Sequence, residues 1–227
     1  MKNLTTGIVG VFICLCLLLG CKNLKETKQS ETGVQWILPD FLGENSKALK
    51  ISGNPQLTDS PYGKVVYFDG EDDAFFLDLN PLESFNEFTI EMIFKPAIDG
   101  DFEQRIVHIG EVSGDRMLLE IRAIDGLWYF DGFVASKENK KALIDSTLIH
   151  PLAKWYHVAF VVTPNSLSTY VNRKKELHET FKFQSIQTGK SSLGVRLNKR
   201  SWFKGSIYKV KITPKELRPN EFIDLKS

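Results

Sequence analysis

The feature that most restricts the fold of this chain is a stretch in which apolar and polar side chains alternate. Phe88, Ile90, Met92 and Phe94 fall at every second position, and the residues between them are polar except for Ile93. A β-strand turns successive side chains to opposite faces, so this pattern predicts a strand with one face in a hydrophobic core.

Short apolar runs recur along the chain, separated by regularly spaced prolines and glycines. Long helical patterns are absent, and the best helix start, at residues 213–216, has room for barely one turn before Pro219. Many short strands with evenly placed turns predict an all-β fold, a two-sheet antiparallel jelly-roll sandwich over residues 34–227 with almost no helix. The other predicted strands are 65–68, 105–109, 117–122, 127–130, 156–162, 168–172, 192–196 and 206–212.

Residues 1–20 have the layout of a cleavable signal peptide. Lys2 precedes an apolar run from Ile8 to Leu19, which is shorter than the roughly 20 residues that a membrane-spanning helix needs. The run leads into Leu-Leu-Gly-Cys, which resembles the bacterial lipobox, where the cysteine becomes the lipidated first residue. We therefore expect lipidation at Cys21, followed by a polar, flexible tether over residues 21–33.

Cysteine usage and charge restrict the partners of the chain. Cys14, Cys16 and Cys21 are its only cysteines, so a mature chain that starts at Cys21 forms no internal disulfide and no thiolate metal site. The 29 basic and 28 acidic side chains leave no excess charge to hold nucleic acid or anionic lipid. We expect membrane attachment through the acyl chains alone. Lys22 follows the lipidated cysteine, and by resemblance to the enteric sorting rule this favours the outer membrane of a bacterial cell envelope.

Three groups of residues carry a family resemblance: 66–77 with 88–96, 155–159 with 168–172, and 203–207 leading to Leu217. In this order and spacing they resemble the laminin-G-like branch of the concanavalin A-like lectin and glucanase superfamily. The resemblance implies a two-layer, lectin-like sandwich. Tyr208 and Lys209 stand where relatives often carry an acidic pair, and Arg173 follows Asn172 where relatives commonly turn through a glycine. Both departures weigh against an inherited metal or ligand site.

The acidic residues do not form the constellation of the laminarinase-type glucanases of this superfamily. Those enzymes place acids at alternate positions of one strand, and the chain has no Glu-x-Asp-x-x-Glu motif. Glu87 and Glu91 share a strand face but would lie about 13 Å apart, too far to act on one glycosidic bond. The 4 histidines are scattered without zinc spacing, and His157 is expected to be packed and hydrogen-bonded. We therefore expect no enzymatic activity.

One acidic cluster, Asp69, Glu71, Asp72 and Asp73, is a candidate for calcium, since oxygen ligands at a turn can hold this ion. The competing interpretation is a solvated turn with ordinary side-chain to backbone hydrogen bonds. It is favoured because calcium takes six or more oxygens, and the sequence offers only these carboxylates. No other cofactor is expected.

Aromatic residues near turns supply the candidate ligand site. A half-exposed indole beside polar groups suits the apolar C–H face of a sugar. Trp128 lies beside Tyr129 and Asp131, and Trp202 follows a polar loop, so these four are the predicted ligand-binding residues. The competing interpretation packs both tryptophans in the core, as expected for Trp155.

The sequence thus predicts a non-catalytic lipoprotein of the cell envelope whose sandwich domain binds a carbohydrate. One alternative is a module that binds or scaffolds another envelope protein. A second alternative is a glycan-processing enzyme with an unrecognised site. The expected partner is a glycan or an envelope protein, and fold alone does not choose between them.

Overall fold

A computed structural model describes residues 33–43 and 49–225. The chain separates into two units, Met1–Ser30 and Glu31–Ser227, and every described residue belongs to the second. The predicted signal peptide, the lipidated Cys21 and all but the last residue of the tether lie outside the described residues. Within the described ranges, no helix is long and apolar enough to cross a bilayer.

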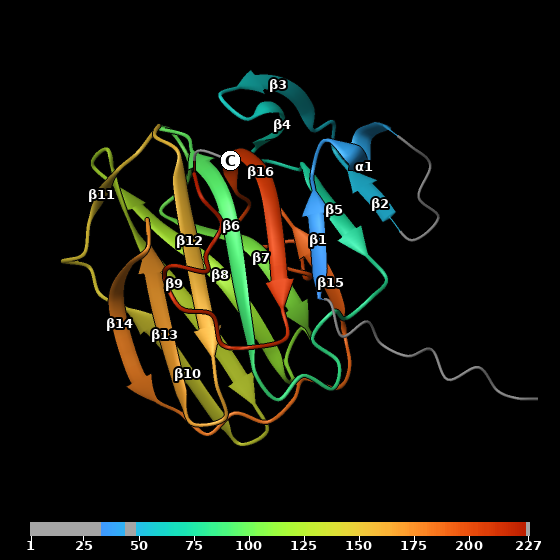
Figure 1. The fold of residues 1–227 in the computed structure, drawn as a ribbon. Coiled ribbons are helices and arrows are strands. Elements are labelled where there is room, and N and C mark those ends of the chain that lie inside the picture. Colours follow the sequence, from blue (N-terminus) through green and yellow to red (C-terminus); the bar gives the residue numbers. More distant parts are fainter. Residues whose placement is uncertain (1–32, 44–48, 226–227) are drawn as a thin grey trace, which may run out of the picture. The chain divides into compact units, whose positions relative to one another are not determined.

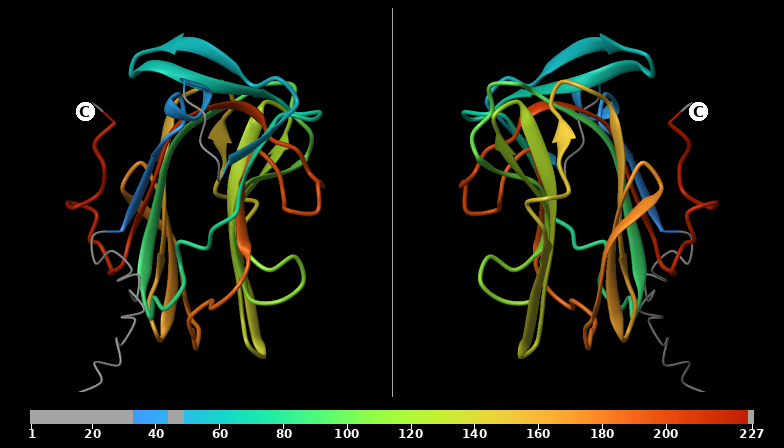
Figure 2. Two further views of the ribbon diagram at one scale, coloured as in Figure 1. Left: turned by 90° about the vertical axis from the view of Figure 1, so that its right-hand side faces the viewer. Right: turned by 90° about the vertical axis from the view of Figure 1, so that its left-hand side faces the viewer.

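The second unit is built from two antiparallel sheets that lie face to face (Figures 1 and 2). The predicted jelly-roll sandwich is therefore confirmed, and the single helix of the described residues is α1 (Asp40–Gly43). Sheet A contains β1 (Val34–Ile37), β3 (Gln56–Ser60), β4 (Gly63–Asp69), β6 (Phe88–Pro96), β12 (Tyr156–Val162), β13 (Ser166–Val171), β14 (Lys174–Thr180) and β16 (Lys204–Thr213). Sheet B contains β2 (Leu49–Ser52), β5 (Ala74–Leu77), β7 (Glu103–Gly110), β8 (Arg116–Ile124), β9 (Leu127–Ser136), β10 (Asn139–Ile144), β11 (His150–Pro151) and β15 (Lys190–Leu193).

The predicted core strand is β6, in the middle of sheet A between β12 and β16. Phe88, Ile90, Met92 and Phe94 are fully buried and belong to the core cluster that fills the space between the sheets. Each fully buried side chain of this size contributes roughly 1.5–3 kcal/mol to folding. The alternation in the sequence therefore records which face of β6 meets sheet B.

The other predicted strands are present, and most extend beyond the predicted bounds. The run predicted at 192–196 overlaps β15 only at its first two residues, because Gly194 takes a positive φ of 86° and turns the chain into a loop. The best helix start of the sequence, at residues 213–216, does not form a helix. Thr213 ends β16, and the chain continues to residue 225 without a helix, along the outer side of sheet A (Figure 2).

Hydrogen bonds from sheet A hold this C-terminal segment, residues 214–225, and replace those that a helix would make. Thr89 Oγ1 donates to the Lys215 carbonyl oxygen at 2.8 Å and accepts the Leu217 N–H at 2.9 Å. Leu217 and Phe222 pack with Ala159, Val161 and Tyr170 in a second hydrophobic cluster. The C-terminal segment thereby buries the outer face of the sheet, which explains why β12 is apolar on both faces.

A buried histidine–glutamate contact lies under the same segment. His157 and Glu91 have no exposed side-chain surface, and His157 Nε2 lies 2.9 Å from Glu91 Oε1. The same carboxylate oxygen accepts the backbone N–H of Ile223 at 2.6 Å. His157 is thus packed and hydrogen-bonded, as the sequence predicted, and the pair ties the end of the chain to sheet A.

Two backbone positions show how local sequence shapes the sandwich. Asn172 and Arg173 both take positive φ, 48° and 67°, in the two-residue connection between β13 and β14. A type I′ hairpin turn requires positive φ at both central residues, so this turn forms without glycine. At Gly205, a Cβ atom would lie 2.4 Å from the Lys95 carbonyl oxygen, so only glycine fits the close approach of β16 to β6.

Candidate functional site

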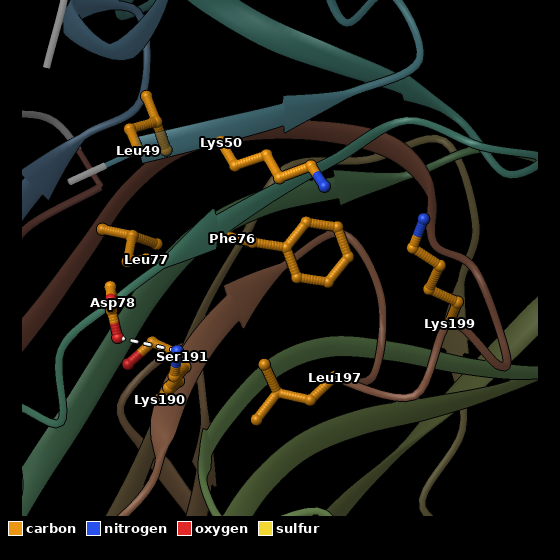
Figure 3. Close-up of a pocket in the computed structure, with 9 residues that line it drawn as sticks. All are labelled: Leu49, Lys50, Phe76, Leu77, Asp78, Lys190, Ser191, Leu197 and Lys199. Carbon is orange, nitrogen blue, oxygen red and sulfur yellow. Dashed lines mark ion pairs between the residues drawn. The ribbon is translucent and has the colours of Figure 1, made fainter. Parts of the chain in front are cut away.

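A large hollow lies at one side of sheet B, on the face turned away from sheet A. We call it the Phe76 pocket, with a volume of about 490 Å³. Strands β2, β5 and β15 and the loop between β15 and β16 form its walls (Figure 3). Its lining combines apolar and charged side chains: Leu49, Lys50, Phe76, Leu77, Asp78, Lys190, Ser191, Leu197 and Lys199.

Strand alternation places the Phe76 ring in the pocket. Phe75 and Leu77 of β5 turn into the core, so Phe76 between them turns outward and remains partly exposed. The strand register sets Phe76 opposite Lys50 of β2 and Ser192 of β15. The pocket therefore presents an aromatic ring on a rigid sheet, with polar side chains around it (Figure 3).

The charges around this ring are mainly positive. Lys190 forms an ion pair with Asp78 at 2.9 Å on one side of the pocket. On the other side, Lys199 Nζ lies 5.8 Å from the Phe76 ring centroid, within cation–π range. Lys50, opposite Phe76 on β2, also lines the pocket, so both lysine side chains border it (Figure 3).

A constrained loop carries Lys199. Lys199 and Ser201 adopt left-handed backbone angles, with φ of 57° and 60°, although neither is glycine. The Lys199 N–H donates to the Arg196 carbonyl oxygen at 2.8 Å, and the Arg105 N–H donates to the Ser201 carbonyl oxygen at 2.9 Å. The loop is therefore fixed to sheet B, and Lys199 is held beside the pocket at a backbone cost of about 1–2 kcal/mol.

A second hollow of about 420 Å³ continues the Phe76 pocket along sheet B and shares Lys190 and Leu197 with it. The rest of its lining comes from residues 110–112 and Gly189. Arg196 donates from its guanidinium to the Val112 carbonyl oxygen at 2.7 Å, which fixes this wall. The two hollows therefore adjoin each other on sheet B.

The structure corrects the expectation for Trp128. Its side chain is 0% exposed and belongs to the core cluster between the sheets. The ring packs edge-on against Phe94 and Tyr156, with centroid distances of 5.3 and 4.9 Å. The indole has no free face for a sugar, because β9 turns Trp128 inward.

The other three predicted ligand residues lie apart from the Phe76 pocket. Tyr129 and Asp131 point to the outer face of sheet B, but both are almost completely buried. Trp202 is partly exposed in the loop that supplies Leu197 and Lys199, yet it does not line the pocket. The ligand role predicted for these three residues has no test in the structure and stays a prediction.

A pair of acids on the outer face of sheet B bears on catalysis. Glu120 and Asp131 are cross-strand partners in β8 and β9, a separation that a retaining glycosidase can use. Arg122 binds both, at 3.0 Å to Glu120 and 2.7 Å to Asp131, and Arg105 binds Glu120 at 2.9 Å. Burial and the nearby charge of Glu120 raise the pKa of Asp131 to about 6. Because both side chains are at most 5% exposed, a substrate has no access to them.

The acidic cluster at the β4–β5 turn is partly assembled. Carboxylate oxygens of Asp69, Asp72 and Asp73 lie within 4.8 Å of one another, whereas Glu71 stays outside the group. Asp69 Oδ1 accepts the backbone N–H groups of Glu71, Asp72 and Asp73, and these bonds lower its pKa although burial opposes them. Asp73 accepts from Asn54 and Asp69, and burial raises its pKa. Much of the oxygen set is thus committed to backbone hydrogen bonds, and calcium binding stays a prediction.

The fold and the site can now be compared with known proteins. Residues 69–222, more than half of the chain, match the family model described as the concanavalin A-like lectin/glucanases superfamily. The chain belongs to this superfamily. No curated protein sequence matches it significantly.

Solved structures of this lectin-like fold include domains of carbohydrate-active and toxin proteins. Domain 4 of AbnA, a GH43 extracellular arabinanase from Geobacillus stearothermophilus solved with arabinotriose, is 21% identical, with a TM-score of 0.60 over 76% of this chain and 85% of that one. The CBM40 of the Ruminococcus gnavus IT-sialidase, bound to α2,3-sialyllactose, is 17% identical, with a TM-score of 0.55 over 69% of this chain and 93% of that one.

The binding domain of botulinum neurotoxin serotype D is 16% identical, with a TM-score of 0.54 over 76% of this chain and 44% of that one. The present chain therefore spans less than half of the toxin domain. At these identities the likeness shows the shared fold.

Sequence reasoning missed the Phe76 pocket. Phe76 stands next to Phe75 in a short apolar run, which hides the fact that the two rings point to opposite faces. Lys50 and Lys199 lie 149 positions apart in the sequence, and neither belongs to a recognisable motif. The usable signal was the alternation in β5, since an aromatic residue on the outer face of a superfamily sheet is a candidate ligand platform.

Proposed function

We propose that this chain is a non-catalytic, carbohydrate-binding lipoprotein of the bacterial cell envelope, and that the Phe76 pocket is its glycan site. The observation that carries the proposal is the partly exposed Phe76 ring on the outer face of a lectin-like sheet, beside Lys50, Asp78 and Lys199. A sugar presents an apolar C–H face together with a rim of hydroxyl groups, and this pocket offers a partner to each.

The arrangement of acids supports binding without catalysis. The glucanase motif is missing from the sequence, and the one cross-strand acid pair on sheet B, Glu120 and Asp131, is buried under Arg122. Within the Phe76 pocket, Asp78 is the single carboxylate and it pairs with Lys190. Two carboxyl groups facing one bond, as glycoside hydrolysis requires, are not found in this part of the described structure.

The envelope assignment rests on the N-terminal sequence. The lipobox-like Leu-Leu-Gly-Cys segment supports lipidation at Cys21, and Lys22 supports the outer membrane. Metabolic labelling with a palmitate analogue should mark the chain in a bacterial host, and Cys21→Ser should abolish the label. A labelled Cys21→Ser chain would refute the lipid anchor and leave the glycan site unaffected.

Replacing the aromatic platform tests the glycan site. Phe76→Ala should weaken saccharide binding on a glycan array about tenfold, the equivalent of about 1.4 kcal/mol, while the melting temperature changes little because the ring is partly exposed. Phe102→Ala is the matched control, since Phe102 is 53% exposed outside the pocket. Unchanged saccharide binding by Phe76→Ala would refute the site.

A protein partner is the second candidate function. Phe102 and Ile124 are 53% and 51% exposed, and they are neighbours because the Ala123 N–H donates to the Phe102 carbonyl oxygen at 2.8 Å. A partner that binds through this pair should be lost in Phe102→Ala and should not be released by free saccharide. In that case Phe76→Ala would leave binding unchanged.

A further inference from the structure

The Phe76 pocket differs in charge from the chain that contains it. Its lining holds three lysines, Lys50, Lys190 and Lys199, and one carboxylate, Asp78. The whole chain has 29 basic and 28 acidic side chains and is therefore nearly neutral. The local surplus of two positive charges is thus a feature of the pocket and does not follow from the composition of the chain. A concave site lined by one sign of charge favours ligands of the opposite sign.

Two of these lysines lack an acidic partner. Lys190 pairs with Asp78, whereas no carboxylate of the described residues lies within ion-pair distance of Lys50 or Lys199. Both side chains line the Phe76 pocket, and Lys199 Nζ lies over the Phe76 ring, 5.8 Å from its centroid (Figure 3). Two like charges beside one open space repel each other unless an anion lies between them.

Two arginines lie beside the second hollow, since Arg116 is the strand partner of Gly110 and Arg196 binds Val112. Arg116 and Arg196 donate to the carbonyl oxygens of Gly114 and Val112, and neither forms an ion pair within the described ranges. Burial lowers the pKa of Arg116, and the nearby charge of Arg196 lowers it further. The Nε atoms of both guanidinium groups are buried without a hydrogen-bond partner. These arginines add positive charge beside the second hollow, whose own lining holds one basic and one acidic side chain, Lys190 and Glu111.

The strained backbone at Lys199 also indicates that this residue has a function. A lysine at a φ of 57° is disfavoured, and glycine or asparagine would fit this turn with less strain. Strained backbone that the surrounding structure holds in place is found mainly at functional sites. Here the hydrogen bonds of the loop, Lys199 N–H to Arg196 and Phe203 N–H to Gly194, both 2.8 Å, fix the lysine beside the ring.

We propose that the saccharide bound in the Phe76 pocket is acidic, with its carboxylate or sulfate group between the ammonium groups of Lys50 and Lys199 and a sugar ring against Phe76. This inference rests on the proposed glycan site and adds the chemical class of its ligand. Charge-assisted hydrogen bonds from two lysines would supply the selectivity for an acidic over a neutral sugar.

The test compares saccharides that differ in charge alone. The full chain in detergent is titrated by calorimetry with oligogalacturonate and with its methyl ester, and separately with oligosaccharides of κ-carrageenan before and after desulfation. The acidic member of one pair should bind about tenfold more tightly than its neutral counterpart, and this preference should fall as ionic strength rises. The pair that shows the preference distinguishes a carboxylate from a sulfate ligand.

Charge variants assign the preference to the pocket. Lys50→Gln and Lys199→Gln should each remove most of the preference, and Lys199→Arg should keep it. Lys174→Gln is the matched control, since it removes an exposed lysine from β14 of sheet A. Binding of neutral and acidic saccharides with equal affinity would overturn this inference and leave the glycan site standing. Binding of no saccharide in the wild type would overturn the proposed function itself.

Discussion

At the scale of single residues, Lys199 is expected to lower the stability of the fold while it contributes to ligand binding. Its left-handed backbone disfavours any side chain with a Cβ atom, so Lys199→Gly should relieve strain. We expect the free energy of unfolding to rise by up to about 1 kcal/mol, while affinity for an acidic saccharide falls. Urea denaturation and calorimetry measure the two quantities. A variant that loses stability, or that binds as well as the wild type, contradicts the role given to Lys199.

His108 predicts a pH dependence of stability. Burial, with the charges of Arg196, Arg116 and Arg105, lowers its pKa to about 4. Between this pKa and the ordinary value of 6.5, the unfolded chain binds a proton that the folded chain excludes. Stability from this residue is therefore present above about pH 6.5 and is lost as the pH falls toward 4.

The corresponding variant is His108→Gln, which cannot take up the proton. Across that pH range, the wild type should lose up to about 3 kcal/mol more than the variant. Asp131 acts in the opposite direction, since its raised pKa makes the folded chain bind the extra proton. The difference between wild type and variant isolates His108, and parallel urea profiles from pH 4 to 7 would refute its assignment.

At the scale of elements, the C-terminal segment is a structural part of sheet A. Glu91→Ala removes the acceptor for His157 and for the Ile223 N–H and leaves a buried imidazole unpaired. We expect a loss of about 3–5 kcal/mol in the free energy of unfolding and faster proteolysis within residues 214–225. Glu91→Gln keeps an acceptor oxygen and should protect the segment better. Equal protection of the segment in wild type and Glu91→Ala would contradict its attachment through Glu91.

The β4–β5 turn gives a prediction about metal removal. The Asp69 and Asp73 carboxylates accept hydrogen bonds from backbone N–H groups, so the turn is held without an ion. We expect a chelator to leave the melting temperature unchanged. If added calcium raises the melting temperature of the wild type but not of Asp72→Asn, the cluster is a calcium site after all.

The sequence was most informative where a strand has one face in the core. The alternation of Phe88, Ile90 and Met92 predicted β6 and its inward face, whereas β2, β3 and β14, whose side chains are all exposed or partly exposed, were not predicted. The site was harder to predict. Trp128 proved to be a core residue and Phe76 a surface one, because the face on which an aromatic lies depends on register between strands that are distant in sequence.

At the scale of the whole molecule, the two outer faces of the sandwich differ in what lies on them. The outer face of sheet A carries Glu91 and His157 and is covered by the chain's own C-terminal segment. The outer face of sheet B carries the Phe76 pocket and the adjoining second hollow. The C-terminal segment covers part of sheet A, where a hollow of about 280 Å³ remains, whereas the Phe76 pocket on sheet B has about 490 Å³.

The central claim is that a saccharide binds on this face of sheet B. The most direct measurement is a crystal structure of the chain with the acidic oligosaccharide that binds best in calorimetry. Our account predicts a sugar ring against Phe76, with its anionic group in hydrogen-bond contact with Lys50 and Lys199. A saccharide bound at another place, such as the turn at Asp69 or the exposed loop of Trp202, would contradict it.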